Sequence, residues 1–324
     1  MKLNPSLKRY LLFTLHTPSI ILNKYFVSPK QAIKIKNIIK QSPVGEEVSL
    51  SESFFFGTSF RISSQERFDI LKATLKESLR GFTSPVNPIK LKVSDASDSE
   101  YALKNQEIFV DYKGLNLEYT NKKERLNSAY QNMLSTSDES FFGMVFDDFP
   151  IIGMSPEFIK ACCKLLKNFE GLVDLIYMEG VTHDTIDTKT KTVYYKHADR
   201  TILKHRNDIL GVVSYNNYRF AIVKNFCYGF FFNRIIARTR QYAEKLLWYM
   251  ENVDYNSPHK IELAGSLRIG PVYNYIAIPL EVINMDLDYS HTDTSIRKPA
   301  QKAEELYKAM TDNYSIQALD KINI

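Results

Sequence analysis

One stretch of the sequence, residues 141–164, limits the fold more than any other. It opens with a mostly apolar run from Phe141 to Phe146, which is typical of a strand buried on both faces of a parallel sheet. Asp147 and Asp148 follow the run directly, and a Ser-Pro pair at 155–156 then marks a helix start. The stretch therefore predicts a strand, an acidic turn and a helix.

The acidic pair is the main candidate for a functional site. It follows the carboxyl end of the predicted strand, and ligands of open α/β sheets bind at that edge. Carboxylates there suit a divalent cation that also binds a phosphorylated ligand. A solvated Asp-Asp turn is the alternative interpretation. The order of the other elements decides between the two.

Alternating strands and helices continue on both sides of this stretch. Right-handed crossovers between parallel strands would bring the loops 61–66, 95–100, 120–127 and 147–153 to one edge of a parallel sheet. The later chain is less regular, with an insertion over 181–206 and an aromatic-rich segment over 218–232. The sequence predicts strands over 54–60, 89–94, 115–119, 172–177 and 272–278, and helices after residue 64 and over 121–134, 238–250, 258–267 and 299–310.

The composition is that of a folded protein with a substantial core. Of the 324 residues, 44% are hydrophobic and 13% aromatic. The three cysteines lack the spacing of a zinc site or a disulfide framework, which predicts buried thiols in a reducing compartment. We expect one compact domain over 51–298, with a nucleotide-binding half (51–170) and an acceptor half (171–298), a basic N-terminal extension (1–50), and a C-terminal helix and tail (299–324).

The positive charge is concentrated near the N-terminus. Residues 1–45 hold seven Lys, one Arg and no acid, a charge of +8, so the net charge of +5 leaves 5 − 8 = −3 for the remainder. A basic arm, with a predicted helix from Pro29 to Ile39, indicates an anionic surface such as a membrane as its neighbour. A nucleic-acid enzyme is disfavoured because its whole body would be basic.

An apolar run from Tyr10 to Leu22 lies within this arm. It is interrupted by His16 and Pro18, and it falls short of the ~20 residues that a spanning helix needs. It also lacks a small-residue cleavage site. The expected location is therefore cytoplasmic, with peripheral contact at the inner membrane face through the basic arm.

The order of the segments 57–67, 71–79, 91–98, 121–132 and 145–149 resembles the nucleotide-sugar-dependent glycosyltransferases of the GT-A fold, in particular the inverting family-2 type. The resemblance covers roughly residues 55–165. It implies an α/β fold with a Rossmann-like, mostly parallel central sheet flanked by helices. It also implies a metal-dependent enzyme of polysaccharide biosynthesis that transfers a sugar from a nucleotide-sugar to a saccharide or lipid-linked acceptor.

The same resemblance implies roles for individual residues around the donor and the cation. The acid at 95 would accept a hydrogen bond from the nucleotide base, and the acid at 147 would face the ribose. The acid at 148 would bind Mn²⁺ or Mg²⁺, with a C-terminal histidine as a further metal or diphosphate ligand. The implied donor-binding residues are Phe60, Arg61, Arg67, Asp95, Ser97, Asp98, Arg125, Asn127 and Asp147, and the implied metal ligands are Asp148 and His291.

The general base is where the sequence departs from the family pattern. The usual acidic pair would fall near His259 and Lys260, and Glu262 is the nearest carboxylate. His259 and Glu262 are three apart on a predicted helix and share a face, so either could be the base with the other orienting it. A surface charge and a cap-region residue are the alternative. A non-catalytic nucleotide-sugar-binding protein therefore stays open as an alternative function. A sugar-phosphate nucleotidyltransferase, which shares a related sheet, is a second alternative, disfavoured because such enzymes usually open with a Gly-rich loop and this chain has only Gly57 there.

Overall fold

The structure is a computed structural model that describes most of the first half of the chain and selected segments of the second. The described residues are 27–41, 47–124, 126–178, 180–182, 186–187, 192–193, 209–224, 235–244, 274–286 and 315–316. Within these segments, no helix combines the length and the apolar character needed to cross a bilayer.

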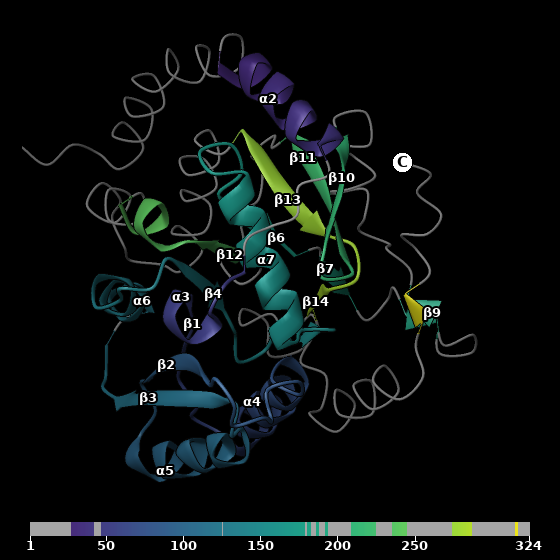
Figure 1. The fold of residues 1–324 in the computed structure, drawn as a ribbon. Coiled ribbons are helices and arrows are strands. Elements are labelled where there is room, and N and C mark those ends of the chain that lie inside the picture. The colour runs from purple at the N-terminus through teal and green to yellow at the C-terminus, as the bar shows by residue number, and fades with distance from the viewer. Residues whose placement is uncertain are drawn as a thin grey trace, which may run out of the picture.

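A nine-stranded sheet forms the centre of the fold, in the order β10-β11-β13-β6-β12-β4-β1-β2-β3 (Figure 1). β11 and β12 are antiparallel to both of their neighbours, and the other pairs are parallel, so 9 − 2 = 7 strands share one direction. The predicted α/β class with a large, mostly parallel sheet is confirmed. The strands are β1 Phe54–Phe60, β2 Ile89–Asp95, β3 Leu115–Asn121, β4 Phe141–Met144, β6 Leu175–Tyr177, β10 Ile209–Tyr215, β11 Tyr218–Lys224, β12 Ile235–Arg238 and β13 Tyr275–Pro279.

Helices flank this sheet, and two of them begin where the sequence predicts. Ser64 caps α4 by accepting a hydrogen bond from the backbone N–H of Arg67, and Ser155 caps α7 in the same way from Phe158. Cys162 is fully buried in α7, as predicted for the thiols there. The helices are α2 Ser28–Lys40, α3 Leu50–Ser53, α4 Gln65–Ser78, α5 Ser99–Ile108, η2 Phe109–Asp111, α6 Leu126–Ser135 and α7 Pro156–Asn168.

The boundary between β3 and α6 differs from the prediction of a helix over 121–134. β3 continues to Asn121, and α6 begins only at Leu126. The cause is the ladder with β2, in which Asp95 pairs with Asn121 and the Asn121 side chain donates to the backbone oxygens of Asp95 and Ser97. These bonds to the neighbouring strand extend β3 at the expense of the first helical turn.

The helix of the basic arm lies against the sheet. α2 covers the predicted helix and adds one residue at each end. Ile35 is fully buried, and the Ser28 hydroxyl lies 3.0 Å from the Tyr275 hydroxyl of β13. Its four lysines are exposed, so one face of α2 packs on the core and the other presents positive charge to solvent.

Two small sheets accompany the large one. β5 (Ile151–Ile152), β14 (Ile283–Asp286) and β7 (Gly180–Thr182) form the first, in the order β5-β14-β7. They follow β4, β13 and β6 in the chain, so this sheet lies beyond the carboxyl ends of those strands. β15 (Ser315–Ile316), β9 (Thr192–Val193) and β8 (Ile186–Asp187) form the second.

The start of the aromatic-rich segment over 218–232 forms the second strand of a regular hairpin. β10 and β11 pair antiparallel through a two-residue turn at Asn216 and Asn217, whose φ angles are 48° and 69°. Positive φ at both central residues is the type I′ geometry that joins hairpin strands, and asparagine tolerates it. Residues 239–244 are helical, as predicted for the start of the 238–250 helix, whereas the helices predicted over 258–267 and 299–310 lie outside the described residues.

Gly114 occupies a tight crossing that supports β3. A Cβ there would lie 2.7 Å from the backbone carbonyl atoms of Phe82 and 2.9 Å from the oxygen of Ser84. We expect Gly114→Ala to lower the free energy of unfolding in urea by about 3 kcal/mol, because backbone atoms cannot turn aside as a side chain can. Gly171→Ala is the control: its methyl meets nothing within 4 Å, so only the left-handed backbone at φ 69° costs energy, about 1 kcal/mol. Equal losses for the two variants would contradict the crowding argument.

Candidate functional site

The topology creates a switch point between β1 and β4. The chain runs from β1 outward to β2 and β3, then returns to β4 on the other side of β1 (Figure 1). The loops after β1 and β4 therefore leave the sheet in opposite directions at its carboxyl edge. Ligands of open α/β sheets bind in the crevice that such a reversal leaves.

The predicted acidic pair lies at this switch point and is ion-paired with Arg67. Asp147 and Asp148 follow β4 and are 8% and 3% exposed. Arg67, in the first turn of α4, donates from Nη2 to Asp147 Oδ2 and from Nη1 to Asp148 Oδ2, the latter over 3.5 Å. One guanidinium thus joins the β1–α4 connection to the β4–β5 connection.

The two carboxylates raise the pKa values of the neighbouring Arg67 and Tyr130. Burial by itself lowers the pKa of Arg67, but the carboxylates of Asp147 and Asp148 outweigh it and raise that pKa above its ordinary value. Burial raises the pKa of Tyr130, on α6, and the two carboxylates raise it further. The Tyr130 hydroxyl lies near the backbone of Ser59 without a hydrogen bond of good geometry, so it is a protonated, buried donor beside the acidic pair.

Asp95, at the end of β2, is held from within the protein. It is fully buried, its Oδ1 accepts the backbone N–H of Ser97 at 2.7 Å, and its Oδ2 accepts from Asn105 Nδ2 at 2.9 Å and from the Tyr119 hydroxyl. Burial, then the bond to Asp95, raises the pKa of Tyr119, which keeps this hydroxyl a donor. We call Asp95, Ser97, Asn105 and Tyr119 the Asp95 cluster.

The Asp95 cluster ties together the loops that follow three neighbouring strands. Ser97 Oγ accepts the backbone N–H of Ile62, in the loop after β1, at 2.7 Å. The backbone oxygen of Asp95 accepts from the N–H of Lys122, just after β3, at 2.9 Å. The hydrogen bonds of the Asp95 cluster therefore hold the loops at the carboxyl edge of the sheet in place.

Sequence reasoning missed Asn105 and Tyr119, although both bind the predicted Asp95. Asn105 is on α5, a helix whose bounds the sequence did not predict, and its side chain is fully buried. Tyr119 was assigned to a strand, but nothing in its local pattern indicated the direction of its hydroxyl. The sequence offers one indication for Asn105. It is a polar residue at the seventh position of a helix that follows an Asp-Ser-rich turn.

The remaining predicted residues fall into three groups. Ser97 and Phe60 are buried at 2% and 5% exposure, whereas Arg61 is exposed at the start of the loop after β1. Asp98 is exposed at the N-cap of α5, where a hydrogen bond and ion pair with Lys123 at 2.7 Å lower its pKa. Asn127 belongs to α6, and its side chain is not among those described. Arg125, His259, Glu262 and His291 lie outside the described residues.

The residues at the acidic pair could hold a divalent cation only if a bound phosphate ligand supplied further oxygen atoms. Among the described residues, no three His, Cys, Asp or Glu side chains gather into a metal-binding group. Asp147 and Asp148 supply two adjacent carboxylates. That number suffices for Mg²⁺ or Mn²⁺ when substrate phosphates and waters complete the coordination.

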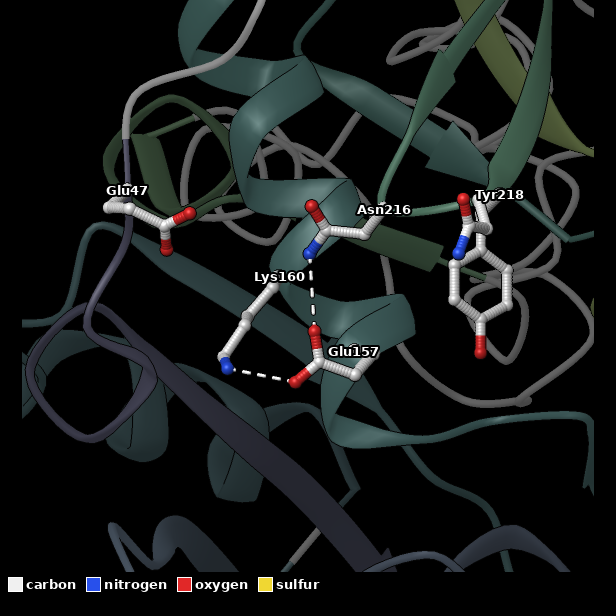
Figure 2. Close-up of a pocket in the computed structure, with 6 residues that line it drawn as sticks. Glu47, Glu157, Lys160, Asn216 and Tyr218 are labelled. Atoms are coloured by element: carbon white, nitrogen blue, oxygen red, sulfur yellow. Dashed lines mark hydrogen bonds and ion pairs between the residues drawn. The ribbon is translucent and has the colours of Figure 1, made fainter.

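A polar cavity of about 480 Å³ lies beside the first turns of α7 and the β10–β11 turn (Figure 2). Glu157 accepts a bond from Lys160 at 2.8 Å and another from Asn216 at 3.3 Å, so these lining side chains bind one another. None of the predicted site residues lines this cavity. Its lining residues are Glu47, Glu157, Lys160, Asn216, Asn217 and Tyr218.

Comparison with known proteins finds a likeness at the level of structure only. No family model matches the chain, and no curated protein sequence matches it. The crystal structure of S. aureus TarS 1–349 is 10% identical with a TM-score of 0.43, over 73% of this chain and 61% of that one. The structure of TarS 1–349 in complex with UDP-GlcNAc is 11% identical with a TM-score of 0.44, over 83% of this chain and 70% of that one.

A further similar structure is 4-diphosphocytidyl-2C-methyl-D-erythritol synthase from Anaerococcus prevotii DSM 20548. It is 12% identical with a TM-score of 0.40, over 85% of this chain and 97% of that one. Our chain thus spans about three fifths of the first TarS structure and most of the synthase. These are likenesses of fold.

Proposed function

We propose that the protein is a metal-dependent glycosyltransferase, which transfers a sugar from a nucleotide-sugar donor to a saccharide or lipid-linked acceptor with inversion. The observation that carries this proposal is the placement of Asp147 and Asp148 at the β1/β4 switch point, beside the N-terminus of α4. This is where an α/β sheet offers a phosphorylated ligand both a crevice and positive helix ends.

The arrangement suits the departure of a nucleoside diphosphate. Negative charge develops on the leaving diphosphate, and a divalent cation held by Asp148 and the phosphates would stabilise it without proton transfer. Arg67 supplies a permanent positive charge beside this place, and its raised pKa keeps it charged throughout the physiological range. The buried Tyr130 hydroxyl, whose pKa is raised by burial and by the two carboxylates, would be available as a donor to an anion that reached it.

The donor's nucleoside is proposed to bind along the edge formed by the loops after β1 and β2. Phe60, Arg61 and Asp98 border these loops, and the Asp95 cluster fixes their backbone. We propose that Asp95 orients the loops at this edge. The loop after β2, which Asp95 holds, would then contact the nucleotide base. Arg125 and Asn127 remain proposed neighbours of the diphosphate.

Inverting transfer also needs a general base that accepts the acceptor hydroxyl's proton. Glu262, oriented by His259, is our proposal for that base, and His291 for the further metal or diphosphate ligand. The acceptor half over 171–298 and peripheral membrane contact through the exposed lysines of α2 are likewise proposed.

A thermal-shift screen tests donor binding directly. Nucleoside diphosphates and Mn²⁺, each alone and together, are added to the full chain while its melting temperature is followed. A ligand at 100 times its Kd that binds only the folded state adds about 2.7 kcal/mol of stability. We expect at least one nucleoside diphosphate to raise the melting temperature, and to raise it further with Mn²⁺. No shift from any nucleoside diphosphate, with or without Mn²⁺, would contradict the proposal.

A further inference from the structure

Arg67 holds the carboxylate oxygens that a divalent cation needs. Its two terminal nitrogens bind Oδ2 of Asp147 and Oδ2 of Asp148, and the three side chains are only 14%, 11% and 3% exposed. Two positive groups cannot share one pair of oxygens in so small a space, since their mutual repulsion grows as water is excluded. The guanidinium and a cation at these carboxylates therefore compete.

We propose that Arg67 is an internal counter-ion that closes the acidic pair in the ligand-free protein and exchanges places with the cation when the donor binds. This inference rests on the proposed function, and it deepens it by naming the residue that couples the cation to the diphosphate. Arg67 then pairs with the diphosphate that accompanies the cation. The protein should consequently bind the cation weakly alone and more tightly with the nucleotide.

The charges favour such an exchange. With Arg67 bound, the cluster carries −2 + 1 = −1. A divalent cation in its place brings the two carboxylates to −2 + 2 = 0 and leaves the guanidinium with an unmatched +1. A diphosphate beside the cation provides the anion for that charge, and a guanidinium binds phosphate oxygens bidentately.

The backbone of Arg67 is anchored, so the proposed exchange requires only its side chain to move. Ser64 Oγ accepts the Arg67 backbone N–H at 3.3 Å, which fixes the first turn of α4. A positive side chain at a helix N-terminus opposes the helix dipole, so in this place Arg67 depends on the acidic pair. An anion at the same terminus would satisfy both the dipole and the released guanidinium.

A purely structural ion pair is the competing explanation. It would tie α4 to the β4–β5 connection, and its loss would lower stability without improving cation binding. The two explanations differ in the sign of one measurement. Removal of Arg67 should tighten cation binding if the guanidinium covers these oxygens, and should leave it unchanged or weaken it if the ion pair mainly holds the acidic pair in place.

The test measures Mn²⁺ binding to the full chain without nucleotide, by the electron paramagnetic resonance signal of free Mn²⁺. We expect Arg67→Gln to lower the Kd for Mn²⁺ roughly tenfold, equal to about 1.4 kcal/mol of lost competition. The Kd of Arg67→Lys for Mn²⁺ should lie between those of the wild type and Arg67→Gln, because an ammonium cannot bridge both carboxylates. Asp148→Asn should weaken Mn²⁺ binding. Arg80→Gln is the matched control: it removes an exposed arginine beyond the other end of α4 and should leave the Kd unchanged.

A second measurement, UDP binding in EDTA by calorimetry, uses the same variants. Arg67→Gln should weaken UDP binding, the opposite direction to its effect on Mn²⁺. The inference is overturned if a folded Arg67→Gln, or Arg67→Lys should the former not fold, binds Mn²⁺ no more tightly than the wild type. UDP binding by the wild type alongside that result leaves the nucleotide site standing. If no nucleoside diphosphate binds any form, the proposed function is wrong and the exchange on donor binding falls with it, and the Mn²⁺ series then decides only whether Arg67 competes with the cation.

Discussion

Asp148→Asn is expected to reduce the metal-dependent hydrolysis of the nucleotide-sugar donor by about 10²–10³-fold, the scale for loss of one charge-stabilising group. Asparagine keeps the size of the side chain and removes the negative charge that holds the cation. Donor turnover is measured as release of nucleoside diphosphate, with saturating Mn²⁺ and in EDTA. The wild type should lose most of its activity in EDTA, and the variant should be equally slow in both.

Asp174→Asn is the matched control for this experiment. Asp174 is also buried, 8% exposed, and ion-paired to an arginine, with its Oδ1 2.9 Å from Arg238 Nε. It precedes β6 and so lies at the opposite, amino edge of the sheet. The Asp174→Asn variant should be less stable than the wild type but should hydrolyse the donor at the wild-type rate. Wild-type rates in Asp148→Asn would rule out the cation role, and nucleotide binding without turnover in the wild type would indicate a binding protein.

The second large effect concerns folding. Asp95→Ala removes the acceptor of three hydrogen bonds, from the Ser97 N–H, Asn105 Nδ2 and the Tyr119 hydroxyl. Asn105 Nδ2 and the Tyr119 hydroxyl each keep a second acceptor, at 3.2 Å and 3.0 Å, whereas the Ser97 N–H loses its acceptor outright. An unsatisfied buried N–H costs about 1–3 kcal/mol and each of the other two lost bonds about 1 kcal/mol, so we expect a loss of about 3 kcal/mol in the free energy of unfolding. Denaturation in urea, followed by circular dichroism, measures it.

Asp98→Ala is the control for the folding prediction. It removes the same kind of side chain three residues further on, but the Asp98 side chain is 62% exposed and its ion pair with Lys123 is at the surface. Surface pairs contribute about 0–1 kcal/mol. A small loss of unfolding free energy in Asp95→Ala, together with a large loss of nucleotide affinity, would instead support direct contact between Asp95 and the nucleotide base.

The sequence was most informative where structure depends on near neighbours. The Ser-capped starts of α4 and α7 and the buried strands β1, β2 and β4 were predicted because caps and apolar runs act within a few residues. The position of the acidic pair after β4 followed from the same local pattern. The bounds of α5 were not predicted because its apolar residues show only weak helical periodicity.

The sequence by itself therefore determined the class of fold and the edge of the sheet where the acids of residues 147 and 148 lie. Only the tertiary structure decided their partner, because Arg67 is 80 residues from Asp147 in the chain and meets it through the parallel pairing of β1 with β4. It also decided that Asp95 faces inward, since its three donors come from a loop, a helix and a neighbouring strand. Local patterns set which elements form, whereas contacts between distant segments set where each charged group is neutralised, and that depends on the whole packed sheet.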